Sequence, residues 1–505
     1  MKCKKAYLVI NPRAGQNLAK ITDVLAVLSA AGWSTDIALK EYGGQTMDLA
    51  TRAAEDGYDL VVAYGGDGTL NQVVNGVMNA KGQHSIVGVI PGGTANVWAG
   101  EIGIPGDPVK AALALYNSEA RKVDVGHVEV EGLTFPGAAQ DDQQHSGSKP
   151  NKKKVKASGA RHHFLLMAGL GIDAAIMEHV SKPLKYRVGP LAVGVSAAKE
   201  VPEQHPFPVE IHAGALHNGD VLWQGEAIQV VIGNTRRYAD ILKMTPDAYI
   251  DDGILDVCVI TAGDPLTTMQ QITSLLLRRK PDNTTAEYFH GAHLSISVPA
   301  SIAMQLDGSA VKLKDYLSKS DREALERASD PERVMVNYRF DAMPRALRVA
   351  IPCTYDEALF EESTHHEQGT PQVEAQDIAA QAEAVQETPG DHAAQYNGTE
   401  PDQTRQEALE HVKELLEHGR KVTVVGISPN PRKRDTYIIA GSAIKQRTGA
   451  SLPVAVCVEN GATIMKQTGE SMPPAVLPKL QEGETITVEG KKNKRGVIRA
   501  KEILI

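Results

Sequence analysis

Three short segments near the start of the chain have the composition of phosphate-binding turns. They are Asn11-Pro12-Arg13-Ala14-Gly15, Gly65-Gly66-Asp67-Gly68-Thr69-Leu70-Asn71 and Pro91-Gly92-Gly93-Thr94-Ala95-Asn96. Glycine lets the backbone approach an anion closely, and a helix that begins at such a turn directs N–H groups and the positive end of its dipole toward the anion. An ordinary turn would explain the glycines, but neither Asp67 among them nor the Thr69 hydroxyl. The second segment therefore predicts a phosphate site, whereas each of the others, taken alone, is equally typical of an ordinary turn.

Alternating strands and helices position these segments. Buried apolar runs at residues 7–10, 60–63 and 86–90 precede the three segments and read as strands. Residues with the spacing of one helix face follow the first two segments: Ile21, Val24, Leu25 and Leu28, then Leu70, Val73, Val74 and Val77. Such alternation predicts an α/β domain whose parallel sheet carries phosphate-binding turns at the carboxyl ends of its strands. We therefore expect the three turns to converge on one nucleotide site.

The pattern changes after residue 122. Short runs rich in β-branched residues follow at residues 164–167, 227–232, 255–260, 294–298 and 333–338, and helical periodicity becomes sparse. This pattern favours an antiparallel β-sandwich or barrel as the second domain, over residues 123–352. A polar interruption at residues 132–159, which includes Lys152-Lys153-Lys154, predicts a mobile surface loop.

Together the three turns resemble the catalytic domain of the diacylglycerol, sphingosine and ceramide kinase family, and most of all the bacterial soluble lipid kinases. The resemblance continues in the family's order through Val123-Asp124-Val125-Gly126, Ala168-Gly169-Leu170-Gly171-Ile172-Asp173-Ala174, Gly233-Asn234, Pro246 to Asp256 and Leu306-Asp307-Gly308. It covers about residues 1–352. The Gly-Gly-Asp-Gly core also occurs in NAD kinases and phosphofructokinases, but Pro-Gly-Gly-Thr-Ala-Asn and Asp-Asp-Gly-x-Leu-Asp favour the lipid kinases.

The resemblance implies an NAD kinase-like or phosphofructokinase-like α/β domain at residues 1–122 and a β-sandwich lipid-binding domain at 123–352. It implies transfer of the γ-phosphoryl group of ATP, with Mg²⁺, to the hydroxyl of a membrane lipid such as diacylglycerol, in phospholipid biosynthesis. A sphingoid base or another lipid alcohol is an alternative acceptor. The residues implied in ATP binding are Asn11, Pro12, Arg13, Ala14, Gly15, Gly65, Gly66, Asp67, Gly68, Thr69, Leu70, Asn71, Gly93, Thr94 and Asn96.

Carboxylates are implied at two metal sites. Asp67 and Asp124 match positions that the family uses in a network of magnesium and water beside the phosphates. Asp252, with the backbone carbonyls of Tyr249 and Ile254, matches a separate structural magnesium site. A tight carboxylate-bearing loop suits a hard cation with oxygen ligands, although Asp251-Asp252-Gly253 is also typical of a plain turn between strands.

One departure concerns the base that accepts the proton of the lipid hydroxyl. The bacterial family usually has Asp-Gly-Glu, with the glutamate as the proposed base, where this chain has Asp307-Gly308-Ser309. Because serine is no strong base at neutral pH, either Asp67 or Asp307 takes the proton, or activity is weak or absent. The alternative function is therefore a non-catalytic nucleotide- or nucleic-acid-binding protein that retains the kinase fold.

Charge divides the rest of the chain. From Asp356 to Asp402 there are 12 acidic residues and no Lys or Arg, so that residues 353–404 read as an acidic linker. Residues 405–505 carry 17 basic and 11 acidic residues. A helix at 405–419 and five extended runs at 421–427, 436–440, 453–459, 484–489 and 497–505 loosely resemble a small OB-fold β-barrel. The linker predicts few contacts between this barrel and the kinase domains.

Composition and motifs leave several partners open. The basic turns of residues 405–505 suit nucleic acid or anionic lipid, but Tyr437 is the one aromatic residue there for base stacking. The chain has no apolar run approaching the ~20 residues of a membrane span, and its four cysteines form no C-x-x-C pair. These features favour a cytoplasmic protein with peripheral membrane contact, and a homodimer stays open.

Overall fold

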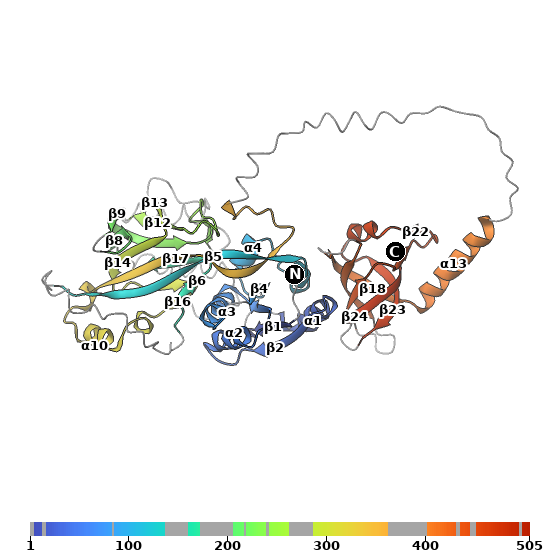
Figure 1. Cartoon of the computed structure of the whole chain (residues 1–505), viewed down its shortest axis with the longest axis horizontal. Helices are drawn as coiled ribbons and strands as arrows, with labels where there is room; N and C mark the ends of the chain where they lie inside the picture. The colour runs from blue at the N-terminus through green and yellow to red at the C-terminus, as the bar shows by residue number, and fades with distance from the viewer. Residues whose placement is uncertain are drawn as a thin grey trace, which may run out of the picture.

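The computed structural model describes twelve stretches of the 505-residue chain (Figure 1). They are residues 5–12, 17–82, 85–136, 160–171, 206–216, 219–238, 242–261, 286–361, 401–430, 435–444, 451–493 and 497–505. Three units follow one another along the long axis, with the α/β unit between the β-sandwich and the C-terminal barrel.

The α/β unit is built on a parallel sheet in the order β4-β3-β1-β2. Its strands are β1 (Lys5–Ile10), β2 (Ser34–Leu39), β3 (Leu60–Gly65) and β4 (Ile86–Pro91). The helices of this unit are α1 (Ile21–Ala30), α2 (Gln45–Glu55), α3 (Asp67–Asn79), α4 (Val97–Glu101) and α5 (Pro108–Tyr116). Strands β3 and β4 are buried along their whole length, as their uninterrupted apolar sequences require. The α/β prediction is confirmed.

A long antiparallel ribbon joins the α/β unit to the second one. It consists of β5 (Ser118–Thr134) and β17 (Met335–Pro352), whose pairing runs from Met335 opposite Thr134 to Pro352 opposite Ser118. At its far end β17 also pairs in parallel with β4. The two units therefore share one continuous sheet, and β5 crosses the domain boundary predicted at residues 122 and 123.

Antiparallel strands form the second unit. They are β6 (His163–Phe164), β7 (Met167–Gly171), β8 (Phe207–Ala213), β9 (Asp220–Gly233), β12 (Leu255–Thr261), β13 (Ala286–Gly291), β14 (His293–Pro299), β15 (Met304–Leu306) and β16 (Ser309–Val311). A separate hydrophobic core lies between them, with Phe164, Tyr338 and Phe340 fully buried. Each of the apolar runs predicted here contributes to a strand, and the predicted sandwich is confirmed.

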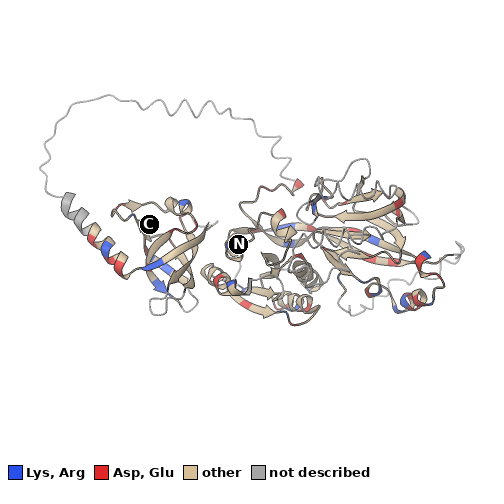
Figure 2. Cartoon of the chain, turned by 180° about the vertical axis from the view of Figure 1, so that it is seen from behind, with Lys and Arg blue, Asp and Glu red and all other residues tan. Residues whose placement is uncertain are grey.

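The C-terminal unit is a closed barrel of five strands. These are β18 (Arg420–Pro429), β19 (Tyr437–Ile444), β20 (Ser451–Val458), β23 (Thr485–Lys492) and β24 (Val497–Leu504). The order β18-β19-β20-β24-β23 closes because β23 also pairs with β18, and β20 runs parallel to β24. Helix α13 (Pro401–His418), which carries both acidic and basic side chains (Figure 2), packs against this barrel. The predicted small β-barrel is confirmed.

The barrel packs against helices α1 and α5 of the α/β unit. Ile438, Ala440 and Ala455 are at most 1% exposed and belong to the same hydrophobic cluster as the α/β core. A 3.2 Å hydrogen bond runs from Ser428 Oγ to the carbonyl of Leu113 in α5. The expectation of few contacts is therefore wrong, because the acidic composition of the linker carries no information about the apolar outer face of the barrel strands.

Deletion of residues 403–505 is expected to destabilise the remaining kinase domains. The deletion exposes apolar surface of α1 and α5 that Ile438 and Ala455 cover, and each apolar side chain returned to water costs ~1.5–3 kcal/mol. We expect a lower melting temperature and more aggregation than for the full chain, measured by differential scanning fluorimetry and light scattering. A truncated protein that melts at the temperature of the full chain would contradict this.

Parts of the predicted loop and linker fall outside the described residues. Of the loop at 132–159, residues 137–159 lie outside them, and of the linker at 353–404, residues 362–400 do. The first residues of the predicted linker are packed rather than solvated, since Leu359 and Phe360 are buried and the Arg121 guanidinium lies 4.1 Å from the centre of the Phe360 ring. Among the described helices, none combines the length and apolar character that a membrane span requires.

Candidate active site

The described parts of the three predicted turns meet at the carboxyl ends of β1, β3 and β4, with the first turn represented by Asn11 and Pro12. Asn11 donates its backbone N–H to the carbonyl of Tyr64 at 3.1 Å and its side-chain amide to Thr69 Oγ1 at 3.3 Å. The turns after β3 and β4 touch directly, because a Cβ added to Gly93 would lie 2.4 Å from the Cα of Gly66. No side chain fits there. The described residues of the turns therefore converge as predicted, and their close approach requires glycine.

Asp67 is placed between the starts of two helices. It begins α3, and its carboxylate accepts hydrogen bonds from the backbone N–H groups of Val97 at 3.0 Å and Trp98 at 3.2 Å, in the first turn of α4. Asn96 orients this turn from a left-handed conformation (φ 52°) by exchanging hydrogen bonds with the backbone of Gly93. Each Asp67 oxygen keeps acceptor capacity beyond its α4 hydrogen bond. Burial raises the pKa of Asp67 to about 6, and the charge of Asp307 adds to this.

Asp307 lies in a tight hairpin turn between β15 and β16. Asp307 (φ 47°) and Gly308 (φ 71°) are both left-handed, while Leu306 pairs with Ser309. That geometry requires Asp-Gly or a similar pair. The carboxylate is saturated: Oδ2 accepts from the Asn71 amide at 2.8 Å and the Leu165 N–H at 2.9 Å, and Oδ1 accepts from the Leu166 and Met167 N–H groups at 2.9 and 3.1 Å. Asp307 therefore holds the turn against α3 and β7, and its lone pairs are already engaged.

Ser309 lies beside the start of α3. A Cβ added to Gly68 would come within 2.7 Å of Ser309 Oγ, so residue 309 borders the turn that is predicted to bind phosphate. Since Asp307 is saturated and Ser309 carries no carboxylate, Asp67 is the best placed of the predicted carboxylates to accept a proton at this turn.

Two residues that sequence reasoning missed complete this cluster. Asn75 follows Asp67 and Asn71 at helical spacing on α3, and its side chain accepts from the N–H groups of His162 and His163 at 2.9 Å each. Arg161 donates to Asn71 Oδ1 at 3.1 Å and to the carbonyls of Ser309 and Ala310 at 3.5 and 3.2 Å. The i, i+4, i+8 spacing of Asp67, Asn71 and Asn75, which places them on one face of α3, was a signal for Asn75, whereas nothing in the sequence pointed to Arg161.

The Arg161 guanidinium is mostly buried and bonds only to neutral oxygens. Within the described stretches, no carboxylate lies within 4.0 Å of it, and burial lowers the pKa of Arg161. A buried charge without a paired carboxylate is costly. Its hydrogen bonds fix the Asn71 side chain and the strand that carries Ser309 in one arrangement.

Arg161→Met is expected to lower kcat about fivefold. The change keeps much of the side-chain volume but leaves Asn71 Oδ1 and two carbonyls without their donor, and one lost hydrogen bond of ~1 kcal/mol in the transition state corresponds to about fivefold in rate. Steady-state kinetics of Arg161→Met and of Arg161→Lys, which keeps the charge, measure this. Unaltered kcat in a folded Arg161→Met protein would show that Arg161 does not position the site.

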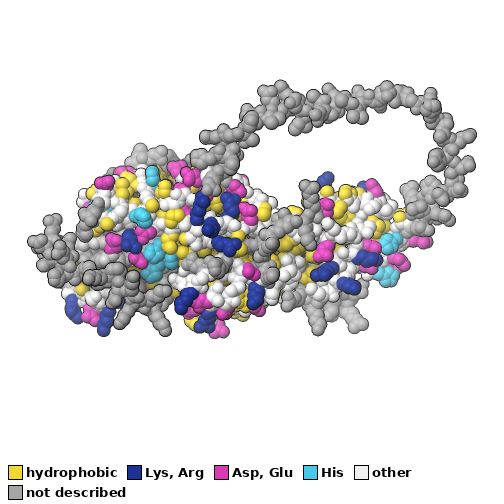
Figure 3. All heavy atoms as spheres, in the orientation of Figure 1, with side chains coloured by type: hydrophobic (Ala, Val, Ile, Leu, Met, Phe, Trp, Pro, Cys, Tyr) yellow, Lys and Arg dark blue, Asp and Glu magenta, His cyan; other side chains and the backbone are white. Residues whose placement is uncertain are grey.

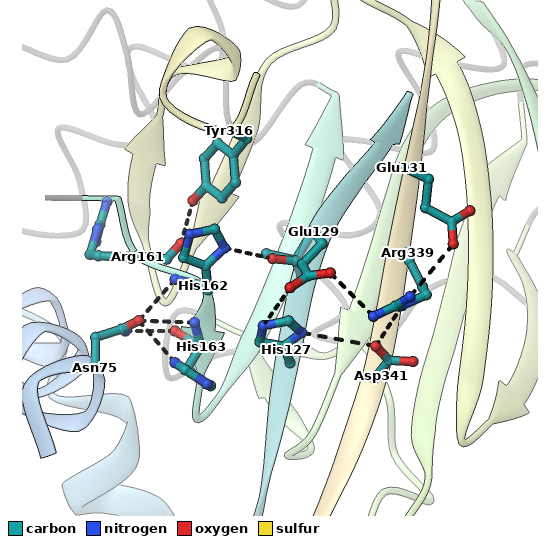
Figure 4. A network of polar contacts seen from close by, with 11 residues as sticks. Asn75, His127, Glu129, Glu131, Arg161, His162, His163, Tyr316, Arg339 and Asp341 are labelled. Carbon is teal, nitrogen blue, oxygen red and sulfur yellow. Dashed lines mark hydrogen bonds and ion pairs between the residues drawn. The ribbon is translucent and has the colours of Figure 1, made fainter. Parts of the chain in front are cut away.

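A polar network continues from Asn75 across the sandwich (Figure 4). The rings of His127 and His162 stack with centres 5.9 Å apart, and His127 lies 3.7 Å from Glu129 and 3.9 Å from Asp341. Arg339 pairs with Asp341 at 2.8 Å, and histidine side chains gather on this face of the sandwich (Figure 3). Burial lowers the pKa of His127. The network links α3 to β5 and β17, and its polar groups are partners of one another in hydrogen bonds and ion pairs.

Asp124 has other hydrogen-bond partners than Asp67. Its carboxylate accepts from the backbone N–H groups of Gly253 and Arg345 at 2.6 Å each. Asp252 accepts from the Ile254 N–H at 3.0 Å, and burial together with the charge of Asp124 raises the pKa of Asp252 to about 6. The structure thus places Asp124 against the predicted structural metal loop. In the described part of the chain, no three His, Cys, Asp or Glu side chains converge as a metal site, but one carboxylate with backbone carbonyls needs no such cluster.

The other predicted ATP contacts are placed as follows. Thr94 is exposed at the edge of the site, while the Leu70 side chain packs in the core and Asn71 is turned toward Asp307. Pro12 is half-buried beside Asn11. Arg13, Ala14 and Gly15 lie outside the described residues.

Comparison with known proteins agrees with this geometry. Residues 5–128 match the family model of the diacylglycerol kinase catalytic domain, and residues 167–350 match that of the YegS C-terminal NAD kinase beta sandwich-like domain. A diacylglycerol kinase of Staphylococcus saprophyticus is 29% identical over 306 residues, which are 60% of this chain and 88% of that protein. One of Bacillus subtilis is 27% identical over 308 residues, 60% of this chain and 89% of that protein.

A solved structure shares the fold. A crystal structure of a diacylglycerol kinase homologue from Bacillus anthracis superposes with a TM-score of 0.51 and 19% identity, over 70% of this chain and 99% of that one. At this identity the likeness shows the fold alone. The two matched domains, in the order and arrangement that the site requires, identify the chain as a lipid kinase of the diacylglycerol kinase family.

Proposed function

We propose that this enzyme transfers the γ-phosphoryl group of ATP to the hydroxyl of a membrane lipid such as diacylglycerol. The observation that carries the proposal is the contact of Asn11 and of the two glycine turns after β3 and β4 around Asp67, at the N-terminus of α3. Helix N-termini and free N–H groups at glycine turns attract phosphate oxygens. Phosphoryl transfer depends mainly on positioning and on neutralising charge, which is what these turns supply.

In this mechanism Asp67 accepts the proton of the attacking lipid hydroxyl. Its pKa of about 6 keeps it mostly ionised at neutral pH and yet basic enough to take a proton as the oxygen attacks. Asn71 and Asp307 hold the strand of Ser309 against α3, and Arg161 fixes Asn71. Mg²⁺ bound with ATP would neutralise charge on the phosphates. The transferred group moves to the lipid oxygen, and ADP is the leaving group.

Incubation of the purified protein with ATP labelled at the γ-phosphate and a total lipid extract tests this proposal. We expect one labelled lipid, which chromatography against standards identifies as phosphatidic acid or as the phosphate of a sphingoid base or another lipid alcohol. Ser309 favours the second candidate, a non-catalytic nucleotide-binding protein. ATP binding without any labelled lipid would support that candidate and overturn the kinase proposal.

The lipid substrate also suggests where the enzyme works. A kinase with a bilayer lipid as acceptor needs peripheral membrane contact from the cytoplasmic side, where ATP is present, and its product would enter phospholipid biosynthesis. Sedimentation with anionic lipid vesicles measures that contact.

We further propose that Asp252, with the backbone carbonyls of Tyr249 and Ile254, holds a structural Mg²⁺. Burial, together with the charges of neighbouring carboxylates such as Asp124, raises the pKa of Asp252, and an oxygen-ligated hard cation would stabilise the ionised form. Magnesium is expected to raise the melting temperature of the wild type by a few degrees, since ligand at 100 times its Kd adds ~2.7 kcal/mol.

Asp252→Asn is expected to lose most of that rise in melting temperature. The matched control is Asp247→Asn, an exposed carboxylate in the same segment, which should respond to magnesium as the wild type does. Equal magnesium responses of Asp252→Asn and wild type would remove the proposed site.

A further inference from the structure

The outer face of two barrel strands has the composition of a protein interface. Along β19, Ile439 points into the barrel core while its neighbours Ile438 and Ala440 belong to the α/β core. Along β20, Val454 and Val456 point inward, and Ala455 between them is 0% exposed. An isolated barrel would carry polar residues at such outward positions, so this face is built to be covered.

Helices α1 and α5 cover it closely. Cys457 Sγ lies 3.6 Å from the carbonyl oxygen of Ala30, at the end of α1. A Cβ added to Gly426 would come within 3.0 Å of a Leu113 methyl group in α5, so that β18 approaches this helix as nearly as its glycine allows. Small residues on both sides thus bring the barrel strands against the helices, as in a packed protein core.

The covered face is the one on which OB-type barrels bind oligonucleotides. Those barrels use the strands that stand second and third, here β19 and β20. Nucleic acid bound in that way would have to displace α1. The basic composition of residues 405–505 therefore does not make this face a nucleic-acid site.

We propose that the barrel is a tethered binding partner of its own kinase domain, which it holds through β19 and β20 against α1 and α5. Residues 362–400 connect the two parts along the chain and form the tether. Such a tether keeps the barrel at an effective concentration of about millimolar beside the helices. The interface, and not the linker, then determines whether the two parts stay together.

A protease-cleavable sequence inserted between Ala380 and Gln381 tests this in the full chain. After cleavage we expect both fragments to co-elute in size-exclusion chromatography at micromolar concentration. Separate elution of the wild-type fragments would overturn the proposal. An excess of single-stranded oligonucleotide is expected to release no barrel, and release would show that nucleic acid competes for the covered face.

Two interface variants and one matched control complete the experiment. Ala455→Glu in β20 and Leu113→Glu in α5, whose side chain contacts β18, place a charge in the interface from opposite sides, and their cleaved fragments should separate. Ile444→Glu alters β19 at a side chain that is 72% exposed, and its fragments should stay together. Circular dichroism shows whether each variant is folded. Because Leu113→Glu leaves the barrel sequence unchanged, co-elution of its folded fragments would contradict the proposal even if Ala455→Glu fails to fold.

Discussion

Asp67→Asn is expected to lower kcat at least ~10²-fold, the lower end of what a well-placed general base contributes. Asparagine fills the same volume and can still accept one hydrogen bond from α4, but it cannot take a proton from the lipid hydroxyl. Its amide N–H₂ group also faces one N–H group of α4, so we expect a small loss of stability. Kinetics and thermal melting of the same preparation separate these effects.

The chain offers a matched control for the capping role of Asp67. Asp107 also accepts two backbone hydrogen bonds at a helix start, from Val109 at 2.9 Å and Lys110 at 3.0 Å in α5. Both of these bonds go to Oδ1, which an asparagine amide oxygen can replace, so Asp107→Asn should cost little stability and leave kcat within about twofold. Near-normal turnover of Asp67→Asn would remove Asp67 from the chemistry and leave it a helix cap.

The pKa of Asp67 predicts the acid limb of the pH profile. Burial raises this pKa above the ordinary value of an aspartate, to about 6, and the base works only when ionised. The ionised fraction falls as pH drops through 6, so kcat/KM of the free enzyme should fall about tenfold per pH unit below that value. An acid limb centred near pH 4 would point to a carboxylate of ordinary pKa instead.

The local sequence was sufficient to predict the elements that hold the phosphate turns. Uninterrupted apolar strands and the helical spacing after each turn depend on short-range order, and parallel strands bring their carboxyl ends to one edge. For that reason Asn11, Asp67 and Asn96 could be assigned to one site before their contacts were known.

Contacts between distant segments could not be predicted in this way. Asp307 was expected near the chemistry, but four N–H donors from α3 and from residues 165–167 determine that it has no free lone pair. Arg161 gives no local signal because its partners lie about 90 and 150 residues away. The docking of the barrel was missed for the same reason, since Ile438 and Ala455 look like core residues of the barrel until the helices beside them are seen.

Ser309→Glu restores the family's Asp-Gly-Glu and tests which group is the base. The new carboxylate would stand beside the start of α3, near the turn proposed to bind phosphate. If Asp67 is already the base, kcat should stay within about threefold. Like charges ~10 Å apart repel by ~1.7 kcal/mol at an effective dielectric constant of 20, so ATP should bind roughly 15–20-fold more weakly. This is the outcome that we expect, because Asp307 is saturated and Asp67 is not.

The opposite outcome would be as informative, because kcat would then rise instead of staying nearly unchanged. If no group now serves as base, the glutamate should raise kcat by ~10²–10⁴, and the Arg161 guanidinium, whose Nη2 lies 3.5 Å from the Ser309 carbonyl, would help to hold it ionised. Titration of ATP and steady-state kinetics on wild type and Ser309→Glu separate the two cases, with Ser309→Gln as the uncharged control of similar size. A large gain in kcat for Ser309→Glu alone would exclude Asp67 as an effective base, whereas weaker ATP binding in Ser309→Glu and not in Ser309→Gln would place the phosphates beside residue 309.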